Sequence, residues 1–196
     1  MTPKQEERTR TKIKRIKAEL AADKKRWGGY YDDSRGLRYL PSALYQKLED
    51  YQGGLRYTNW FKKNFPDDCG FPDFLFEWTI ILFKTVKYKE AEKKAFETYF
   101  SNTYLFDKFF GNRVVPIDKY ENSNIDIPSY CDFLVYSSGQ AGLSDFSDWL
   151  AKFLSSEKFA SFSTKFIEIN KRLKVEKDHE SRLYLIRQAR QLVEEA

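Results

Sequence analysis

The sequence has few of the residues that build active sites, metal centres and disulfide scaffolds. Its 196 residues include one histidine, His179, and two cysteines, Cys69 and Cys131. Two cysteines outside a C-x-x-C pair cannot form a disulfide framework, and they favour a reducing compartment. A triad or zinc site at His179 would need ligands from distant segments, and we interpret it as a solvated residue at a helix start. We therefore predict no catalytic residue, no cofactor and no metal, and a protein that is not an enzyme.

Long apolar runs are also missing. The most hydrophobic stretch, FLFEWTIILF at 74–83, carries Glu77 and is shorter than the roughly 20 residues of a membrane span. The N-terminus is rich in Lys and Arg and lacks the apolar core of a secretory signal. These absences predict a cytoplasmic protein without a membrane partner. The abundance of Lys, Tyr, Phe, Asn and Ile hints at a bacterial source.

The positive charge is concentrated at the N-terminus. Residues 1–26 hold ten Lys and Arg against four acids, a net charge of +6, whereas the remainder holds 24 against 25. The ten cations are Lys4, Arg8, Arg10, Lys12, Lys14, Arg15, Lys17, Lys24, Lys25 and Arg26. Such a helix could follow a nucleic-acid backbone, bind an acidic protein, pair with a second copy of itself, or simply be solvated. Residues 8–26 carry our candidates for nucleic-acid contact.

Hydrophobic periodicity predicts helices throughout and no convincing strand. The first helix begins at Thr2-Pro3 and ends before Gly28, with a thin apolar stripe of Ile13, Ile16, Leu20 and Trp27. Its first dozen residues are expected to bury nothing. Further helices are expected at 41–49, 52–64, 72–84, 88–100, 103–111, 129–137, 144–155, 157–174 and 178–195.

Two segments match at a fixed offset. Tyr51 and Tyr88 lie 37 residues apart, as do Gly54 and Ala91. A recurrence of that length suits a pair of short helices and indicates stacked helical hairpins. Small residues at these positions would let neighbouring helices approach closely.

Residues 39–100 therefore resemble two degenerate tetratricopeptide repeats. The matching positions are Tyr45, Leu48, Tyr51, Gly54 and Pro66 in the first repeat, and Trp78, Leu82, Tyr88, Ala91 and Ala95 in the second. The offset of 37 exceeds the family's usual 34, Pro41 shortens the first helix, and Val86 stands where the family has a turn glycine. A generic helical bundle is the alternative.

The resemblance implies a concave groove that binds a protein. The groove residues would be Asp73, Phe76, Ile80 and Phe83, with Lys84 at the rim. C-terminal helices could instead cover this face as core. Two repeats cannot bury their own faces, so we expect the C-terminal helices to cap the stack.

The expected architecture is an all-α, solenoid-like set of helical hairpins capped by a C-terminal helical bundle. Its parts are a basic helix and loop at 1–38, hairpins at 39–111, a crossover loop at 112–128, and a helical region at 129–196 that packs on the repeats. The predicted function is a non-enzymatic protein-protein interaction module, or adaptor, with an unidentified protein partner. The alternative is an accessory subunit of a nucleoprotein complex that contacts RNA or DNA through the basic helix.

Overall fold

The computed structural model describes residues 1–195, which contain helices and no strand, as the all-α prediction requires. The chain divides into two compact units, one from Met1 to Tyr88 and one from Lys89 onward. This division does not coincide with the boundaries expected at 38/39 and 111/112. It falls at the start of α5, so the residues of the expected second repeat belong to different units.

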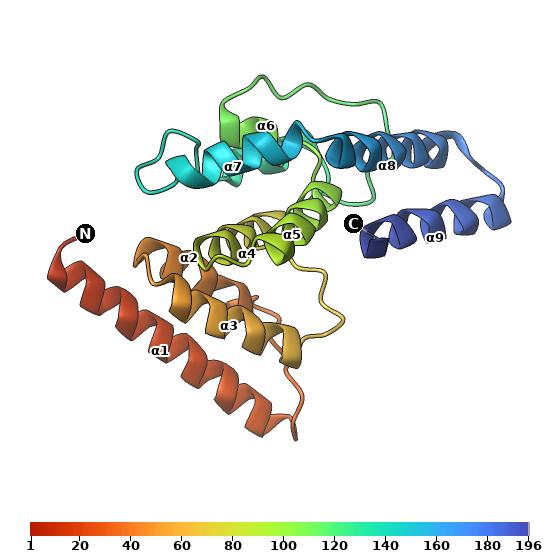
Figure 1. Cartoon of the computed structure of the whole chain (residues 1–196). Coiled ribbons are helices and arrows are strands. Elements are labelled where there is room, and N and C mark those ends of the chain that lie inside the picture. Colours follow the sequence, from red (N-terminus) through yellow and green to blue (C-terminus); the bar gives the residue numbers. More distant parts are fainter. Residues whose placement is uncertain (196) are drawn as a thin grey trace. The chain divides into compact units, whose positions relative to one another are not determined.

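The first unit contains four α-helices and one 3-10 helix. They are α1 (Pro3–Arg26), η1 (Leu37–Tyr39), α2 (Leu40–Lys47), α3 (Tyr51–Asn64) and α4 (Pro72–Lys84). The helix α5 (Tyr88–Ser101) begins at Tyr88, the last residue of the first unit. Figure 1 shows α1 alongside the α2–α3 hairpin.

Local sequence fixes both ends of α1. The Thr2 hydroxyl accepts a hydrogen bond from the Gln5 amide at 3.3 Å, and the Thr2 amide donates to Gln5 Oε1 at 2.9 Å. This capping box, with Pro3 in the first turn, begins the helix. The helix ends before Gly28, whose φ of 62° suits a residue without a Cβ atom.

The basic helix is a structural part of the first unit. Ile13 of α1 packs in one hydrophobic cluster with Tyr45 of α2 and Tyr57 of α3. Thr9 is also buried, so the expectation that the first dozen residues bury nothing is wrong. Trp27, by contrast, leaves the expected apolar stripe and is 51% exposed.

The turns after α2 and α4 share one backbone device. Glu49 and Val86 have positive φ values of 54° and 62°, the only such residues other than glycine among residues 1–195. In each turn the next residue, Asp50 or Lys87, donates its amide hydrogen to the carbonyl five residues earlier, at 3.1 and 2.9 Å respectively. This is the Schellman motif, which ends a helix with one left-handed residue. Glu49 and Val86 lie 37 residues apart, the same offset as the sequence match.

Gly54 is a point of close helix approach. A Cβ atom at this position would lie 2.9 Å from Cδ1 of Ile81 in α4 and 3.4 Å from Cβ of Tyr45 in α2. The missing side chain therefore brings α3 against both neighbouring helices. Ala91, its counterpart in the sequence match, has no exposed surface.

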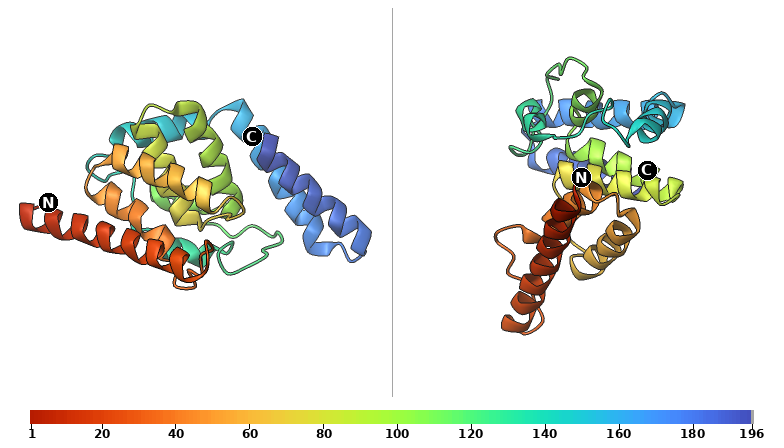
Figure 2. Two further views of the ribbon diagram at one scale, coloured as in Figure 1. Left: turned by 90° about the horizontal axis from the view of Figure 1, so that it is seen from below. Right: turned by 90° about the vertical axis from the view of Figure 1, so that its left-hand side faces the viewer.

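The second unit contains most of α5, followed by α6 (Leu105–Phe110), η2 (Pro128–Phe133), α7 (Ser144–Leu154), α8 (Glu157–Val175) and α9 (His179–Glu195). Figures 1 and 2 show α8 and α9 side by side as an antiparallel hairpin. Aromatic rings of α5 pack against those of α7 and α8. The centre of the Phe96 ring lies 5.0 Å from the centre of the Phe153 ring and 5.6 Å from that of the Phe159 ring.

The crossover loop was expected at 112–128; residues 112–127 contain no helix, and Pro128 begins η2. The Asn102 side chain donates to the Ile125 carbonyl at 2.7 Å, and the Tyr120 amide donates to the Asn170 carbonyl at 2.9 Å. The helix expected at 129–137 is wrong in type and length. Only Pro128–Phe133 is helical, as a 3-10 helix, and extended backbone begins at Leu134.

Within residues 1–195, no helix combines the length and apolar character that crossing a membrane requires.

Candidate nucleic-acid interface

The helix α1 has one buried face and a charged remainder. The buried side chains are Thr9, Ile13, Ile16 and Leu20, at spacings of four, three and four residues. Because a helix repeats every 3.6 residues, these side chains occupy a single stripe. The other faces carry the cations, and all ten predicted cations except Lys24 are exposed.

Three of these cations have partners on the protein. Arg10 pairs with Glu6 at 2.9 Å and with Asp50 at 3.5 Å. Arg15 pairs with Glu19 at 2.9 Å. The hydrogen bond to Glu6 raises the pKa of Arg10, and the hydrogen bond from Arg15 lowers the pKa of Glu19. These groups are at the surface, so the pairs stabilise the fold little.

Lys24 is the third cation with a partner. Its ammonium donates to Asn64 Oδ1 at 2.9 Å and lies 5.1 Å from the centre of the Tyr31 ring. It thus ties the end of α1 to the end of α3. Lys24, which was predicted to contact nucleic acid, is therefore engaged in packing contacts within the protein.

The remaining cations of α1 face solvent without a carboxylate partner among residues 1–195. They are Lys4, Arg8, Lys12, Lys14, Lys17, Lys25 and Arg26.

Four cations form a line that we call the basic row: Lys4, Arg8, Lys12 and Arg15. Their spacings of four, four and three residues place them on one face, away from the buried stripe. With a rise of about 1.5 Å per residue, successive members lie about 6 Å apart along the axis and the row spans about 16 Å. Three of the four, Lys4, Arg8 and Lys12, have no carboxylate partner among residues 1–195, and Arg15 pairs with Glu19. A regular line of exposed cations on a helix can contact successive phosphates of one strand.

The groove residues predicted from the resemblance are largely covered. Phe76 and Ile80 have no exposed surface, whereas Asp73, Phe83 and Lys84 are half-buried. The sequence left open whether this face is a groove or part of the core, and the burial of Phe76 and Ile80 is that of a core helix. A partner could reach Phe76 and Ile80 only after a rearrangement.

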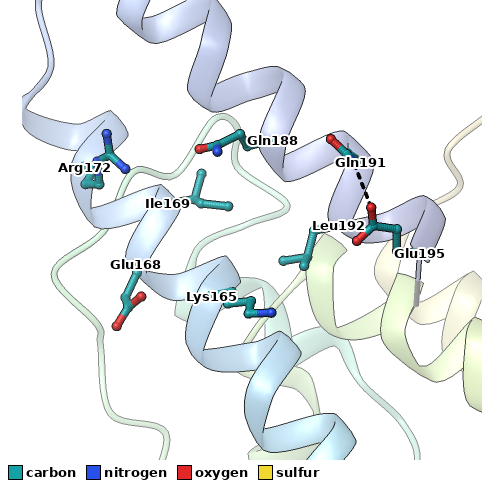
Figure 3. A pocket seen from close by; sticks show the side chains of 8 residues that line it. All are labelled: Lys165, Glu168, Ile169, Arg172, Gln188, Gln191, Leu192 and Glu195. Carbon is teal, nitrogen blue, oxygen red and sulfur yellow. Dashed lines mark hydrogen bonds between the residues drawn. The ribbon is translucent and has the colours of Figure 1, made fainter.

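Two cavities were not predicted. One, of about 330 Å³, lies between α8 and α9 (Figure 3). Its lining is Lys165, Glu168, Ile169, Arg172, Gln188, Gln191, Leu192 and Glu195. The sticks in Figure 3 come from both helices, and Gln191 donates to Glu195 at 2.7 Å. Charges of both signs surround two apolar side chains, so the cavity has no evident preference for a ligand.

The second cavity, of about 370 Å³, lies at the C-terminal end of α1 and is lined partly by Trp27 and Arg26. The glycines at 28 and 29, which mark the end of the helix in the sequence, are the feature from which this cavity could have been predicted. They end the helix and leave the preceding aromatic ring outside the apolar stripe.

The Cys131 thiol is buried. Burial raises the pKa of Cys131 to about 11, and the charge of Asp132 adds to this effect. A thiol with a raised pKa is a poor nucleophile at neutral pH. Cys69 and His179 are exposed. Among residues 1–195, no three His, Cys, Asp or Glu side chains are grouped as a metal site would require.

Comparison with protein-family models, curated proteins and solved structures finds no match to this chain.

Proposed function

We propose that the protein is a non-enzymatic accessory protein that contacts the phosphate backbone of RNA or DNA through the basic row of α1. The observation that carries the proposal is the line of exposed cations, of which Lys4, Arg8 and Lys12 have no carboxylate partner among residues 1–195. Cations that are not neutralised within the protein can replace the counterions of a phosphate backbone.

The packing of α1 supports this function. Ile13, Ile16 and Leu20 are at most 5% exposed, so the helix is fixed to the first unit through a stripe separate from the row. The cations are therefore presented in a preorganised line, and binding does not need to order the helix backbone. Preorganisation lowers the entropic cost of association.

A protein-protein interaction module of the tetratricopeptide kind is the second candidate. The recurrence of the Schellman turn at the 37-residue offset and the close approach at Gly54 favour it. In this proposal Phe83, Lys84 and Asp73 contact a protein partner, or α1 pairs with an acidic protein or a second copy. The covered positions of Phe76 and Ile80 weaken it.

A charge-matched pair of variants tests the first proposal. One variant carries Lys4→Gln, Arg8→Gln and Lys12→Gln; the control carries Lys62→Gln, Lys63→Gln and Lys171→Gln. All six side chains are exposed, and each set lowers the net charge from +5 to +2.

The readout is the fluorescence anisotropy of a labelled oligonucleotide at low salt. We expect the row variant to lose affinity by at least tenfold and the control by much less, because only the row provides aligned contacts. Equal losses would show that net charge alone attracts the oligonucleotide. Binding of a labelled acidic protein in the same assay, while the oligonucleotide does not bind, would favour the second candidate.

A further inference from the structure

Two exposed aromatic rings follow the basic helix. Trp27 is 51% exposed and Tyr30 is 79% exposed. Between them, Gly28 and Gly29 have φ values of 62° and 105° and open space where a Cβ atom would be. A large aromatic side chain stabilises a protein when it is buried and contributes little when it is exposed. Two exposed rings at the end of a basic helix therefore indicate an interaction site.

The neighbouring Tyr31 shows that the segment can bury a ring. Its ring lies 4.6 Å from that of Phe65 and 6.0 Å from that of Trp60, and its hydroxyl donates to Asn64 Oδ1 at 3.2 Å. Tyr31 thus anchors the segment to α3. Trp27 and Tyr30 lie within four residues of this anchor and remain at the surface.

The cavity beside Trp27 suits a neutral planar group better than a phosphate. Asp23 lines it and accepts a hydrogen bond from the Asp32 amide at 2.7 Å. Glu19 is also part of the lining, and it pairs with Arg15 and Arg35. The whole lining holds four carboxylates, the two others being Asp32 and Asp33, against the two arginines Arg26 and Arg35. Its net negative charge disfavours a phosphate, whereas a nucleobase is uncharged and has a face that can stack on the indole.

The helix thus presents cations for the phosphates along its length, and aromatic rings for the bases follow its C-terminal end. From Lys4 to Arg26 it extends about 33 Å at about 1.5 Å per residue. Between the basic row and Arg26, the exposed positions Ala18 and Ala22 are small and leave the helix surface accessible. A fully stacked strand, with about 3.4 Å per nucleotide, would cover this length with about ten nucleotides, and an extended strand with fewer.

We propose that the nucleic acid bound by α1 is single-stranded, and that Trp27 and Tyr30 stack on its unpaired bases where the strand passes the end of the helix. This inference rests on the proposed function, since the basic row must hold the backbone. In a duplex the bases already stack on one another and cannot reach the two rings without melting.

The experiment measures binding of an oligothymidylate of about twelve nucleotides, and of a duplex of the same length, at about 50 mM salt. We expect the wild-type protein to prefer the single strand by about tenfold, the effect of one base–aromatic stack. Trp27→Ala and Tyr30→Ala should each reduce this preference, and Trp27→Phe should retain most of it. The control is Phe133→Ala, which removes an equally exposed ring from the second unit and should leave the preference unchanged.

The outcomes separate the two proposals. If the wild-type protein binds both oligonucleotides equally and Trp27→Ala has no effect, the stacking proposal is overturned while phosphate contact stands. If neither oligonucleotide binds, the proposed function fails together with it. A preference that Phe133→Ala abolishes as strongly as Trp27→Ala would place the stacking rings elsewhere and overturn the assignment.

Discussion

At the scale of single residues, Val86 has the least favourable backbone conformation for its side chain. Its φ is 62°, and its side chain is 68% exposed, so burial does not compensate for the conformation. A left-handed residue costs about 1–2 kcal/mol unless it is glycine, and a β-branched side chain is among the poorest choices. The resemblance implied a glycine at this position, and the positive φ of Val86 is one that glycine adopts without strain.

Val86→Gly should therefore stabilise the protein. We expect the free energy of unfolding to rise by about 1 kcal/mol, because relief of the left-handed strain outweighs the extra entropy that glycine has in the unfolded chain. Urea denaturation measures this. Val135→Gly, at another exposed valine with an ordinary φ, should give no stabilisation, and an equal gain in both variants would contradict the explanation.

Gly54 tests a different property of a single residue, the space around it. A leucine there would collide with Ile81, which has no exposed surface and little room to move. Overpacking of this kind costs about 1–3 kcal/mol. Gly54→Leu should lower the free energy of unfolding by that amount. Gly139→Leu, where nothing lies within 4 Å of the added Cβ, should change it by less than about 0.5 kcal/mol.

At the scale of helices, periodicity and end residues predicted most of the fold. The bounds of α1, α3, α4, α8 and α9 lie within one or two residues of those expected, because proline, capping residues and turn glycines set them locally. The segment after Pro128 was misassigned since a 3-10 turn and a short α-helix have similar composition.

Packing between helices was harder to predict than the helices themselves. The apolar face of α4 is compatible with a groove or with a core, and its burial depends on chain that is distant in sequence. The thin stripe of α1 likewise did not reveal that Ile13 joins the core of the first unit. The cations of α1 were predictable as a set, and so were the partners Glu6 and Glu19 at a spacing of four residues. The partners Asp50 and Asn64 lie 40 residues from Arg10 and Lys24 and were not predictable.

The structural role of α1 can be measured directly. Ile13 is 5% exposed and contacts the tyrosine cluster, so Ile13→Ala should lower the free energy of unfolding by about 2–4 kcal/mol. Ala18→Gly, at an exposed position of the same helix, should cost only about 1 kcal/mol through helix propensity. If Ile13→Ala has the smaller effect, α1 is a detachable arm rather than part of the core.

At the scale of the whole molecule, buried tyrosines in both units predict a loss of stability at alkaline pH. Burial raises the pKa of Tyr57, and burial with the nearby Asp68 carboxylate raises that of Tyr39 to about 12. Burial also raises the pKa values of Tyr99 and Tyr104 to about 12. Above pH 10 the unfolded chain loses phenolic protons that the folded protein keeps.

The unfolded state then binds fewer protons, so the free energy of unfolding falls as pH rises above about 10 and is constant just below that value. Denaturation curves from pH 8 to 11, read by circular dichroism, measure this change. Tyr57→Phe removes one buried phenol and should flatten the decline, although it also loses the 2.6 Å hydrogen bond to the Arg38 carbonyl. Tyr30→Phe is the exposed control. Stability that does not change over this range would contradict the assignment.

The most direct test of the account is the salt dependence of oligonucleotide binding. If the four cations of the basic row each contact one phosphate of a single strand, the logarithm of the association constant should fall with the logarithm of salt concentration with a slope of about −3. Substituting Lys4, Arg8 and Lys12 by Gln should reduce the magnitude of that slope by about 2, and the charge-matched control should leave it unchanged. Binding whose slope is the same in all three proteins would contradict the assignment of α1 as the nucleic-acid interface.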